Sequence, residues 1–469
     1  MNREDAAEVP EYRFPRTIKL ALYQCVRTGV DRPDIGLGIG ALKSFVEKYS
    51  GGKVRVDTFT TLNRNVFFDS VKKNKYDLIG ISSVSVVYNE ALDVIDKLSG
   101  LSPSSKLLLG GAHVSCLGRT LPRGAIGVRG EGELTLLELS YLASRGRFAP
   151  VDLNGVAGIS FWSDAELKSN PPRTLIRNID IIPSFNRDYF TDRAPAAVFT
   201  IRGCPYDCDF CVNYLLWERK VRLHSPEWVV ADLVALKNKN PAARTVVFRD
   251  DIMMLFPDRL KKMAELIINN DTINDLEFVV YGRVDCVSEE IIRVLKSMNV
   301  KCVLFGFESF SRRMLNIYKG ERITPEANQK AIDICFGCGM KAGGNFIIGH
   351  PNETEDDIKI TYEAMLDNFS KKKIQTGGNS ILTPFPATPY WDIAKKKYAI
   401  DDLSFDWSRL NELSYLVARL DHCRDWSVHD WWDYREKSGM MYIGALEARE
   451  ELLPLMQRYE PLMHKYLNI

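Results

Sequence analysis

The chain has 469 residues, of which 45% are hydrophobic and 26% are charged, and its formal net charge is +1. This composition is ordinary for a soluble globular protein, and the length predicts two or three domains. The near-zero charge gives no overall attraction to nucleic acid, and no apolar run is long enough to span a bilayer. We therefore expect neither nucleic acid nor a membrane as a partner.

The N-terminus and the cysteines indicate the compartment. Residues 1–15 are polar and charged, without the apolar core of a secretory signal peptide. Ten cysteines in a chain that is not exported indicate a reducing environment, where thiols bind metals rather than form disulfides. We therefore expect a cytoplasmic protein.

Residues 1–150 alternate short apolar segments with segments of helical periodicity. Such alternation predicts a parallel sheet with helices packed on both of its faces. We expect a doubly wound, Rossmann-like α/β domain, with strands at 18–24, 54–59, 76–82, 106–109 and 127–128 and helices at 38–49, 65–72, 89–98 and 134–144.

Polar and glycine-rich loops follow three of these strands, at the edge where ligands of doubly wound sheets bind. Small residues there allow a large planar or phosphate-bearing ligand to approach the backbone. The candidate residues of these loops are Ser82, Ser83, Val84, Ser85, Gly110, Gly111, His113, Gly130, Glu131 and Glu133.

Residues 151–194 are rich in proline and polar residues and are predicted to connect two domains. In residues 195–395 the strand–helix alternation returns with longer helices, which predicts a partial (β/α)6 barrel. We expect strands at 197–201, 245–249, 276–281, 302–307, 344–348 and 375–382, with helices around 226–237, 258–269, 289–298, 325–338 and 355–367.

Three cysteines, Cys204, Cys208 and Cys211, follow the first strand of the predicted barrel with the spacing C-x3-C-x2-C. The carboxyl ends of barrel strands are where active sites lie. A structural zinc site needs four ligands, and no fourth is obvious here. A cubane iron–sulfur cluster on three thiolates leaves one iron open for a substrate or cofactor. The motif therefore indicates a site of chemistry.

This motif, with the aromatic Phe210 just before its third cysteine, resembles the radical S-adenosylmethionine (SAM) superfamily. The resemblance implies a [4Fe–4S] cluster on the three cysteines. SAM would chelate the open iron and be cleaved to methionine and a 5′-deoxyadenosyl radical. The upstream loops, with the segment 34–39, resemble the cobalamin-binding domain of many radical SAM enzymes. In domain order nearly the whole chain resembles the cobalamin (vitamin B12)-dependent radical SAM enzymes.

The same resemblance implies a SAM site at the strand ends of the barrel. The segment 307–309 and the segment 347–354 match two sequence elements of the family, with Asn345 where the pattern has a glycine. For the adjacent Asp250 and Asp251, capping of a helix is an equally good interpretation. The implied SAM-binding residues are Phe210, Asp250, Asp251, Arg283, Glu308, Ser309, Asn345 and Ile348.

The cobalamin resemblance has one departure. Many cobalamin domains carry D-x-H-x-x-G after the first strand, and its histidine binds the cobalt. Here Gln24 and Val26 stand at the aspartate and histidine positions, so the resemblance implies cobalamin without that histidine ligand. Gln24 and Val26 join the loop residues above as implied cobalamin contacts. Cys25 and His113 are candidate ligands, but a buried thiol and a ring that hydrogen-bonds the cobalamin tail are the favoured interpretations.

Two further features point to no particular chemistry. Cys335 and Cys338 form C-x2-C inside a predicted helix, and we interpret them as buried helix residues rather than a second metal site. Residues 396–469 are predicted to form a small helical cap that walls a substrate cavity or fastens to the barrel. Its aromatic residues are Trp407, Trp426, Trp431, Trp432 and Tyr434.

Together the resemblances imply a C-methyltransferase. A methyl group of one SAM would pass through methylcobalamin to an unactivated sp3 carbon, from which the radical made from a second SAM has removed hydrogen. An external reductant of the flavodoxin or ferredoxin type is implied. The substrate is expected to be a peptide or protein residue, such as those of methyl-coenzyme M reductase, or a small molecule.

Other functions stay open at this point. A cobalamin-dependent radical SAM cyclase or oxidase would use both cofactors without methyl transfer, and a natural-product methylase would share the reaction but not the substrate. A tRNA methylthiotransferase is disfavoured. It needs three more cluster cysteines in its N-terminal domain, where this chain has Cys25 and Cys116.

Overall fold

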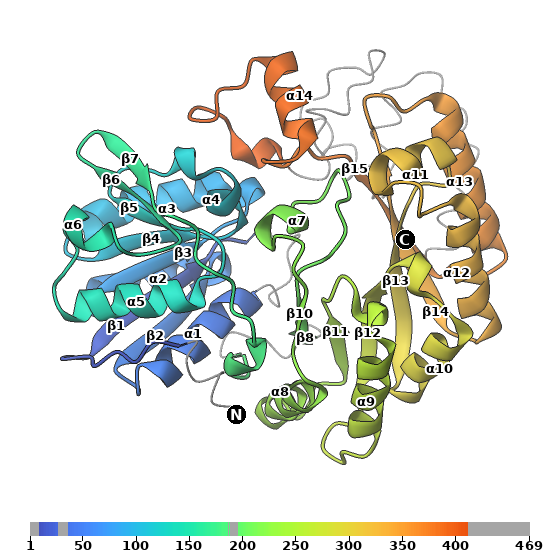
Figure 1. Cartoon of the computed structure of the whole chain (residues 1–469), viewed down its shortest axis with the longest axis horizontal. Helices are drawn as coiled ribbons and strands as arrows, with labels where there is room; N and C mark the ends of the chain where they lie inside the picture. The colour runs from blue at the N-terminus through green and yellow to red at the C-terminus, as the bar shows by residue number, and fades with distance from the viewer. Residues whose placement is uncertain (1–8, 27–35, 186, 188–195, 411–469) are drawn as a thin grey trace. The chain divides into compact units, whose positions relative to one another are not determined.

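The computed structural model of the chain describes residues 9–26, 36–185, 187 and 196–410. The chain divides into two compact units (Figure 1). The first comprises Met1–Ala197, Leu215–Ala243 and Asp402–Ser408, and the second comprises Val198–Tyr214, Arg244–Asp401 and Arg409–Ile469. Each unit is therefore assembled from separate stretches of the chain.

The first unit is built on a sheet of seven strands in the order β2-β1-β3-β4-β5-β6-β7. Its first five strands are parallel: β1 (Ile18–Gln24), β2 (Val54–Thr60), β3 (Leu78–Ser82), β4 (Lys106–Gly110) and β5 (Ala125–Val128). In the register, Gln24 lies opposite Ser82, and Ser82 lies opposite Gly110. The carboxyl ends of these strands therefore meet at one edge of the sheet, where the sequence predicted the candidate loops to lie.

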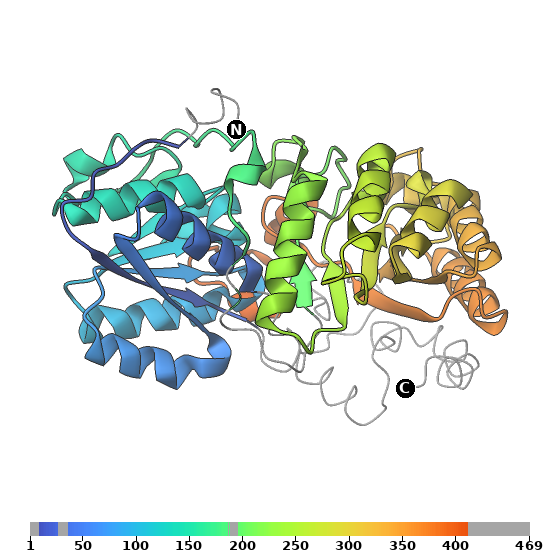
Figure 2. The same cartoon turned by 90° about the horizontal axis from the view of Figure 1, so that it is seen from below.

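Helices cover both faces of this sheet. The helices are α1 (Leu37–Tyr49), α2 (Arg64–Lys73), α3 (Tyr88–Leu101), α4 (Ala112–Cys116) and α5 (Glu133–Ser144). Figure 2 shows α1 and α5 on one face, with α2 and α3 on the opposite face. The predicted doubly wound domain is confirmed.

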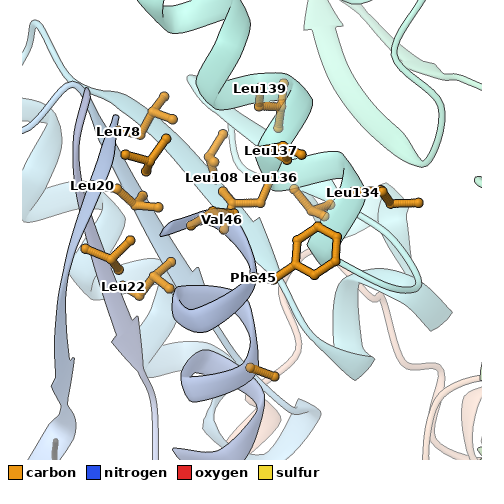
Figure 3. Packing of buried hydrophobic residues seen from close by; sticks show 14 of the residues in the cluster. Leu20, Leu22, Phe45, Val46, Leu78, Leu108, Leu134, Leu136, Leu137 and Leu139 are labelled. Atoms are coloured by element: carbon orange, nitrogen blue, oxygen red, sulfur yellow. The ribbon is translucent and has the colours of Figure 1, made fainter. Parts of the chain in front are cut away.

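The core between the sheet and α1 and α5 is made mainly of aliphatic side chains, with the ring of Phe45 among them (Figure 3). Phe45 and Val46 of α1 and Leu137 of α5 are fully buried, and they pack onto Leu20 and Leu78 of the strands. Burying each such side chain stabilises the fold by roughly 1.5–3 kcal/mol. The apolar residues that recur periodically in the sequence are thus the ones that pack between the sheet and these two helices.

The predicted connector, residues 151–194, contains a hairpin that the sequence interpretation missed. After the short α6 (Pro150–Leu153), β6 (Ile159–Ser163) and β7 (Glu166–Ser169) extend the sheet, and both of the pairings that they add are antiparallel. Asp164 makes the turn with a left-handed φ of 55°, which aspartate tolerates better than most residues. The two strands are short and prolines follow them, so the composition of this segment led to its interpretation as a linker.

The end of this connector packs on α8 (Pro226–Lys239), which belongs to the first unit. The Trp228 indole donates to the Ile182 carbonyl at 2.7 Å. Asp232 accepts from the Phe185 amide at 3.0 Å and forms a buried ion pair with Arg187. The connector is therefore held to α8 by specific polar contacts.

The second unit carries the partial barrel. Its six-stranded sheet has the order β15-β14-β13-β12-β11-β8, and β11 to β15 are parallel. The strands are β8 (Ala196–Val198), β11 (Thr245–Phe248), β12 (Glu277–Gly282), β13 (Val300–Glu308), β14 (Lys341–Ile348) and β15 (Thr376–Ile381). The helices are α9 (Pro257–Ile268), α10 (Glu289–Ser297), α11 (Arg312–Lys319), α12 (Pro325–Gly337), α13 (Glu355–Ser370) and α14 (Pro389–Tyr398). The six predicted strands are all present.

The C-terminal region is described only as far as residue 410. Most of the predicted cap, with Trp426, Trp431, Trp432 and Tyr434, lies outside the described residues. Trp407, the first of its aromatic residues, is described and is 1% exposed. Among the helices that the structure describes, none is both long and apolar enough to cross a membrane.

Candidate functional site

The three motif cysteines lie in the loop that follows β9 (Ile201–Arg202). Cys204, Cys208 and Cys211 are free and half-buried. The Cys211 amide donates to the Cys208 carbonyl at 3.0 Å, which closes a tight turn, and the Asn213 amide donates to the Cys211 Sγ at 3.4 Å. Burial raises the pKa of all three thiols, that of Cys211 to about 12. Metal binding must therefore displace a proton from each thiol.

The donor set of this loop fits an iron–sulfur cluster rather than a single metal ion. Across the part of the chain that the structure describes, no three His, Cys, Asp or Glu side chains gather as ligands of one ion. Thiolates are the ligands of iron–sulfur clusters, and a cubane distributes them over different irons. The C-x2-C pair is separate: Cys335 is fully buried in α12, and Cys338 caps its C-terminus.

Two cations lie beside the middle cysteine. Burial raises the pKa of the Cys208 thiol, and the charges of Lys319 and Arg283 oppose this rise. Arg283 Nη1 lies 3.9 Å from Cys208 Sγ. These positive charges favour the thiolate form that a cluster requires.

Glu308 ends β13 in a strained backbone conformation, with a φ of 58°. The pairing with β14 shifts its register between Gly306 and Glu308. The Glu308 carboxylate lies 2.9 Å from Lys319 Nζ, and both side chains are buried. A Cβ at position 306 would lie 2.4 Å from Glu308 Oε1, so this carboxylate needs the glycine. The predicted SAM contact is therefore a buried carboxylate paired with an ammonium group.

The two adjacent aspartates have different environments. Asp250 is buried and accepts from the amides of Thr200 and Ile201 and from the Thr200 hydroxyl, at 2.5–2.9 Å. Burial raises the pKa of Asp250 to about 6. Asp251 is exposed and accepts from the Asn213 side chain at 2.6 Å. Asp250 therefore fastens the start of the cysteine loop, and Asp251 holds the side chain of Asn213, which follows the motif.

The other predicted SAM residues are placed as follows. Phe210 is half-buried with its ring edge-on to Tyr318, at 5.8 Å between centroids. Ser309 is fully buried and shares a hydrogen bond of 2.8 Å with the Thr361 hydroxyl. Asn345 is exposed on β14, and Ile348 is the last residue of that strand. Ser309 is thus used within the fold, whereas Asn345 is accessible.

In the first unit, the loop after β3 presents mainly an apolar surface. Ser82 is half-buried, and Ser83 and Ser85 are buried, but Val84 is 47% exposed. The loop after β4 packs closely against it: Gly111 has a φ of 101°, and a Cβ there would lie 2.3 Å from the Ser83 carbonyl oxygen. Gly110 before it is half-buried. This edge therefore offers backbone and apolar side chains.

His113 does not face this edge as an available ligand. It is fully buried, with its ring nitrogens 3.0 Å from the hydroxyls of Ser85 and Thr120. It stacks on Tyr88 at 3.6 Å and meets Trp407 edge-on at 4.4 Å. Burial lowers the pKa of His113 to about 3, so the ring is neutral. Both ring nitrogens of His113 are therefore engaged within the unit.

The remaining predicted cobalamin residues are mostly interior. Glu131 is buried and accepts from the Ile176 amide and from Arg222, both at 2.8 Å. Glu133, the first residue of α5, is also buried, whereas Gly130 is exposed with a φ of 73°. Gln24 is half-buried at the end of β1.

The two residues after Gln24 are both buried. The Val26 amide donates to the Thr61 hydroxyl at 2.9 Å. Burial raises the pKa of the Cys25 thiol well above its usual value, which disfavours a thiolate ligand. This agrees with the interpretation of Cys25 as a small buried thiol.

Sequence reasoning missed several residues at both sites. Leu62 and Val66, which follow β2, are 54% and 59% exposed, and they add apolar surface at the carboxyl edge of the first unit. Exposed large apolar side chains near a strand edge are a signal for a ligand surface. Such a surface fits the face of a corrin ring. At the cysteine loop, Tyr206 and Lys319 were missed, because their roles depend on contacts that are distant in sequence.

The chain was compared with known proteins. The radical SAM superfamily profile matches residues 198–365, and the B12 binding domain profile matches residues 29–140. An uncharacterized methyltransferase of Pyrococcus horikoshii is 30% identical over 398 residues, which cover 82% of this chain and 83% of that protein. The anaerobic magnesium-protoporphyrin IX monomethyl ester cyclase of Cereibacter sphaeroides is 22% identical over 357 residues, 73% of this chain and 56% of that protein.

Among solved structures, the radical SAM methyltransferase TsrM from Kitasatospora setae, with cobalamin and a [4Fe–4S] cluster bound, superposes with a TM-score of 0.68. The identity is 18%, and the match covers 81% of this chain and 75% of that one. At this identity the likeness establishes the fold.

The doubly wound unit, the partial barrel and the cysteine loop define a two-domain enzyme that makes use of an iron–sulfur cluster. With the matches above, the chain belongs to the cobalamin-dependent radical SAM methyltransferase family. Its cofactors are a [4Fe–4S] cluster, SAM and cobalamin.

Proposed function

We propose that this enzyme transfers a methyl group from SAM, through cobalamin, to an unactivated sp3 carbon. The observation that carries the proposal is the cysteine loop: three thiols of one C-x3-C-x2-C motif at the strand ends of a barrel of this family. Three protein ligands leave one iron for SAM. An sp3 carbon has no electron pair to attack SAM, so its methylation needs a radical, which this cluster supplies.

In this proposal Cys204, Cys208 and Cys211 hold the cluster. Asp251, Arg283, Glu308 and Asn345 surround SAM, and Phe210 lies beside the cluster. Asp250 and Ser309 support the strand ends from inside the fold, because their polar atoms are engaged there.

Cobalamin would be held at the strand ends of the first unit, by the backbone near Ser82, Gly110 and Gly130 and by the apolar side chains of Val84, Leu62 and Val66. The cobalamin domain spans residues 1–150, the connector 151–194, the barrel 195–395 and a substrate region 396–469.

The overall reaction balances with two SAM molecules and two electrons. One SAM gives its methyl group and leaves as S-adenosylhomocysteine. The other would accept one electron and the substrate hydrogen atom and leave as methionine and 5′-deoxyadenosine, and the second electron would restore the cobalamin to its starting oxidation state. An external reductant, of the flavodoxin or ferredoxin type, supplies the electrons. The stoichiometry therefore predicts equal amounts of S-adenosylhomocysteine, 5′-deoxyadenosine and methylated product.

The experiment is anaerobic turnover of the reconstituted enzyme with SAM that carries a deuterated methyl group. Product mass spectrometry would show one labelled methyl group in place of one hydrogen. Peptides and proteins are the first substrates to test, with small natural-product precursors second. A product of unchanged carbon count, formed together with 5′-deoxyadenosine, would overturn the methyltransferase proposal.

That outcome would favour a second candidate, an oxidative cyclase that uses both cofactors without methyl transfer. The match to the magnesium-protoporphyrin monomethyl ester cyclase supports it, at a lower identity than the match to the methyltransferase. The cyclase reaction would produce 5′-deoxyadenosine without a matching amount of S-adenosylhomocysteine. The ratio of these two products therefore separates the two candidates.

A further inference from the structure

Arg283 is held in place by contacts on two sides. It follows β12, and its Nε and Nη2 donate to the two carboxylate oxygens of Asp285, both at 3.0 Å. Its guanidinium lies 3.4 Å from the centroid of the Tyr206 ring. The Arg283 side chain is 9% exposed, so the guanidinium is largely shielded from solvent. A bidentate ion pair and a stacked cation fix both the position and the plane of the guanidinium.

The third side of the guanidinium faces the cysteine loop. Nη1, the nitrogen that Asp285 does not engage, lies 3.9 Å from Cys208 Sγ. Tyr206 is itself part of the motif, between Cys204 and Cys208. One arginine therefore contacts both an intervening residue of the loop and one of its thiols.

We propose that Arg283 is a positioning residue for the [4Fe–4S] cluster: it clamps the cysteine loop through Tyr206 and raises the reduction potential of the cluster through Cys208. The proposal rests on the assignment of Cys208 as a cluster ligand. The reduced cluster carries one more negative charge than the oxidised cluster, so a fixed cation near a ligand sulfur stabilises the reduced form. Asp285 partly offsets this charge and orients it.

The first test measures the potential without SAM. The full-length protein is reconstituted anaerobically, and its cluster is titrated reductively with detection by electron paramagnetic resonance. Arg283→Gln should shift the midpoint to more negative values. A tenfold lower ratio of reduced to oxidised cluster at the wild-type midpoint corresponds to about 59 mV for one electron. Arg283→Lys keeps the charge and should restore part of the shift.

Two further variants test whether the shift in the midpoint potential follows the charge beside Cys208. Asp285→Asn removes a negative charge and should move the midpoint in the opposite direction, to more positive values. Arg293→Gln is the matched control, because this arginine is 69% exposed in a surface pair on α10 and should leave the midpoint unchanged. An Arg283→Gln midpoint equal to that of Arg293→Gln would overturn the proposal. So would a shift of the same sign in Arg283→Gln and Asp285→Asn.

The clamp itself is tested by the rate of iron release to a chelator. Tyr206→Leu removes the stacked ring and should release iron severalfold faster, whereas Tyr206→Phe keeps the ring and should behave as the wild type. Equal release from both variants would contradict the clamp.

A further result separates this proposal from the assignment on which it rests. If Cys208→Ala binds its full complement of iron, the ligand assignment fails, whatever Arg283 does. If Arg283→Gln weakens SAM binding but leaves the potential unchanged, Arg283 acts only as the SAM contact of the proposed function, and its proposed role toward the cluster is wrong.

Discussion

The strand-end loops of the two units use their polar residues in different ways. In the first unit, His113 and Glu131 are buried and engaged by partners within the unit, and the exposed residues at these loops include the apolar Leu62, Val66 and Val84. In the second unit, thiols and charged side chains are concentrated at one loop, with Arg283 and Lys319 beside Cys208. Both sets of loops follow parallel strands, yet among the described residues the thiols and charged groups that fit a cofactor gather at the second.

The difference matches the cofactors of the family. A cobalamin brings its own metal and ring, so the first unit needs only a fitted surface and a backbone that allows close approach. A cluster and SAM need ligands and compensating charge from the protein. The comparison predicts that the first unit is sensitive to shape and the second to charge.

The largest effect should come from the motif cysteines. Replacing Cys204, Cys208 and Cys211 with Ala removes the proposed cluster ligands, so iron binding and SAM cleavage should be lost. Cobalamin binding should persist, because the first unit contributes no thiol to the cluster in this proposal. Iron content, the 5′-deoxyadenosine yield and the cobalamin absorption spectrum measure the three outcomes. Loss of cobalamin binding in this variant would show that the two sites are coupled.

The buried pair at the end of β13 should be the next most sensitive feature. Glu308→Gln leaves the Lys319 ammonium buried without a carboxylate, which costs roughly 3–5 kcal/mol of unfolding free energy. Denaturant unfolding of the apoprotein measures this loss. Removing both charges, in Glu308→Gln with Lys319→Met, should recover most of the stability.

The surface pair of Arg312 and Glu326 is the matched control. Its side chains are 62% and 70% exposed, so Glu326→Gln should lower the unfolding free energy far less than Glu308→Gln does. If Glu308→Gln and Glu326→Gln lower the unfolding free energy equally, the second unit is not especially sensitive to the loss of a buried charge, and the contrast between the two units fails.

How far the sequence leads depends on the range of the interactions. The cysteine motif was recognisable because its residues are adjacent, and the strands were recognisable because their periodicity is local. The environment of His113 was not, because it is completed by Trp407 from a segment that follows the barrel. Glu131 likewise depends on Arg222. Polar residues at strand ends identify an edge, but distant partners decide which of them remain available.

The prediction that the first unit is sensitive to changes in shape is tested at Gly111. Its φ is 101°, and an added Cβ would lie 2.3 Å from a backbone oxygen of Ser83, so Gly111→Ala forces the loops after β3 and β4 apart. We expect a loss of about 2–3 kcal/mol, together with weaker cobalamin binding. Gly124→Ala is the control, because its φ is 85° but no atom lies within 4 Å of the added Cβ. Equal losses of unfolding free energy in the two variants would mean that the positive φ alone causes the destabilisation. The close approach of the two loops would then contribute nothing.

The smallest effect should be a pH dependence that comes from His113. Burial lowers the pKa of His113 from 6.5 to about 3, while the neighbouring Asp402 opposes this shift. Between these values the unfolded chain binds a proton that the folded chain does not, so the unfolding free energy falls as the pH falls. The His113 contribution should be about 2 kcal/mol smaller at pH 5 than at pH 7.

The measurement is the slope of unfolding free energy against pH for the wild type and for His113→Phe, which keeps an aromatic ring against Tyr88 and Trp407. The variant loses two hydrogen bonds and should be less stable near neutral pH, so the slope and not the absolute value carries the test. Because His350 of the second unit also has its pKa lowered by burial, to about 4, the variant should keep part of the acid sensitivity. A slope unchanged by the substitution would mean that His113 takes up its proton in the folded chain at the same pH as in the unfolded chain. At acidic pH it would then be a charged group at the strand ends of the first unit, and the contrast with the second unit would fail.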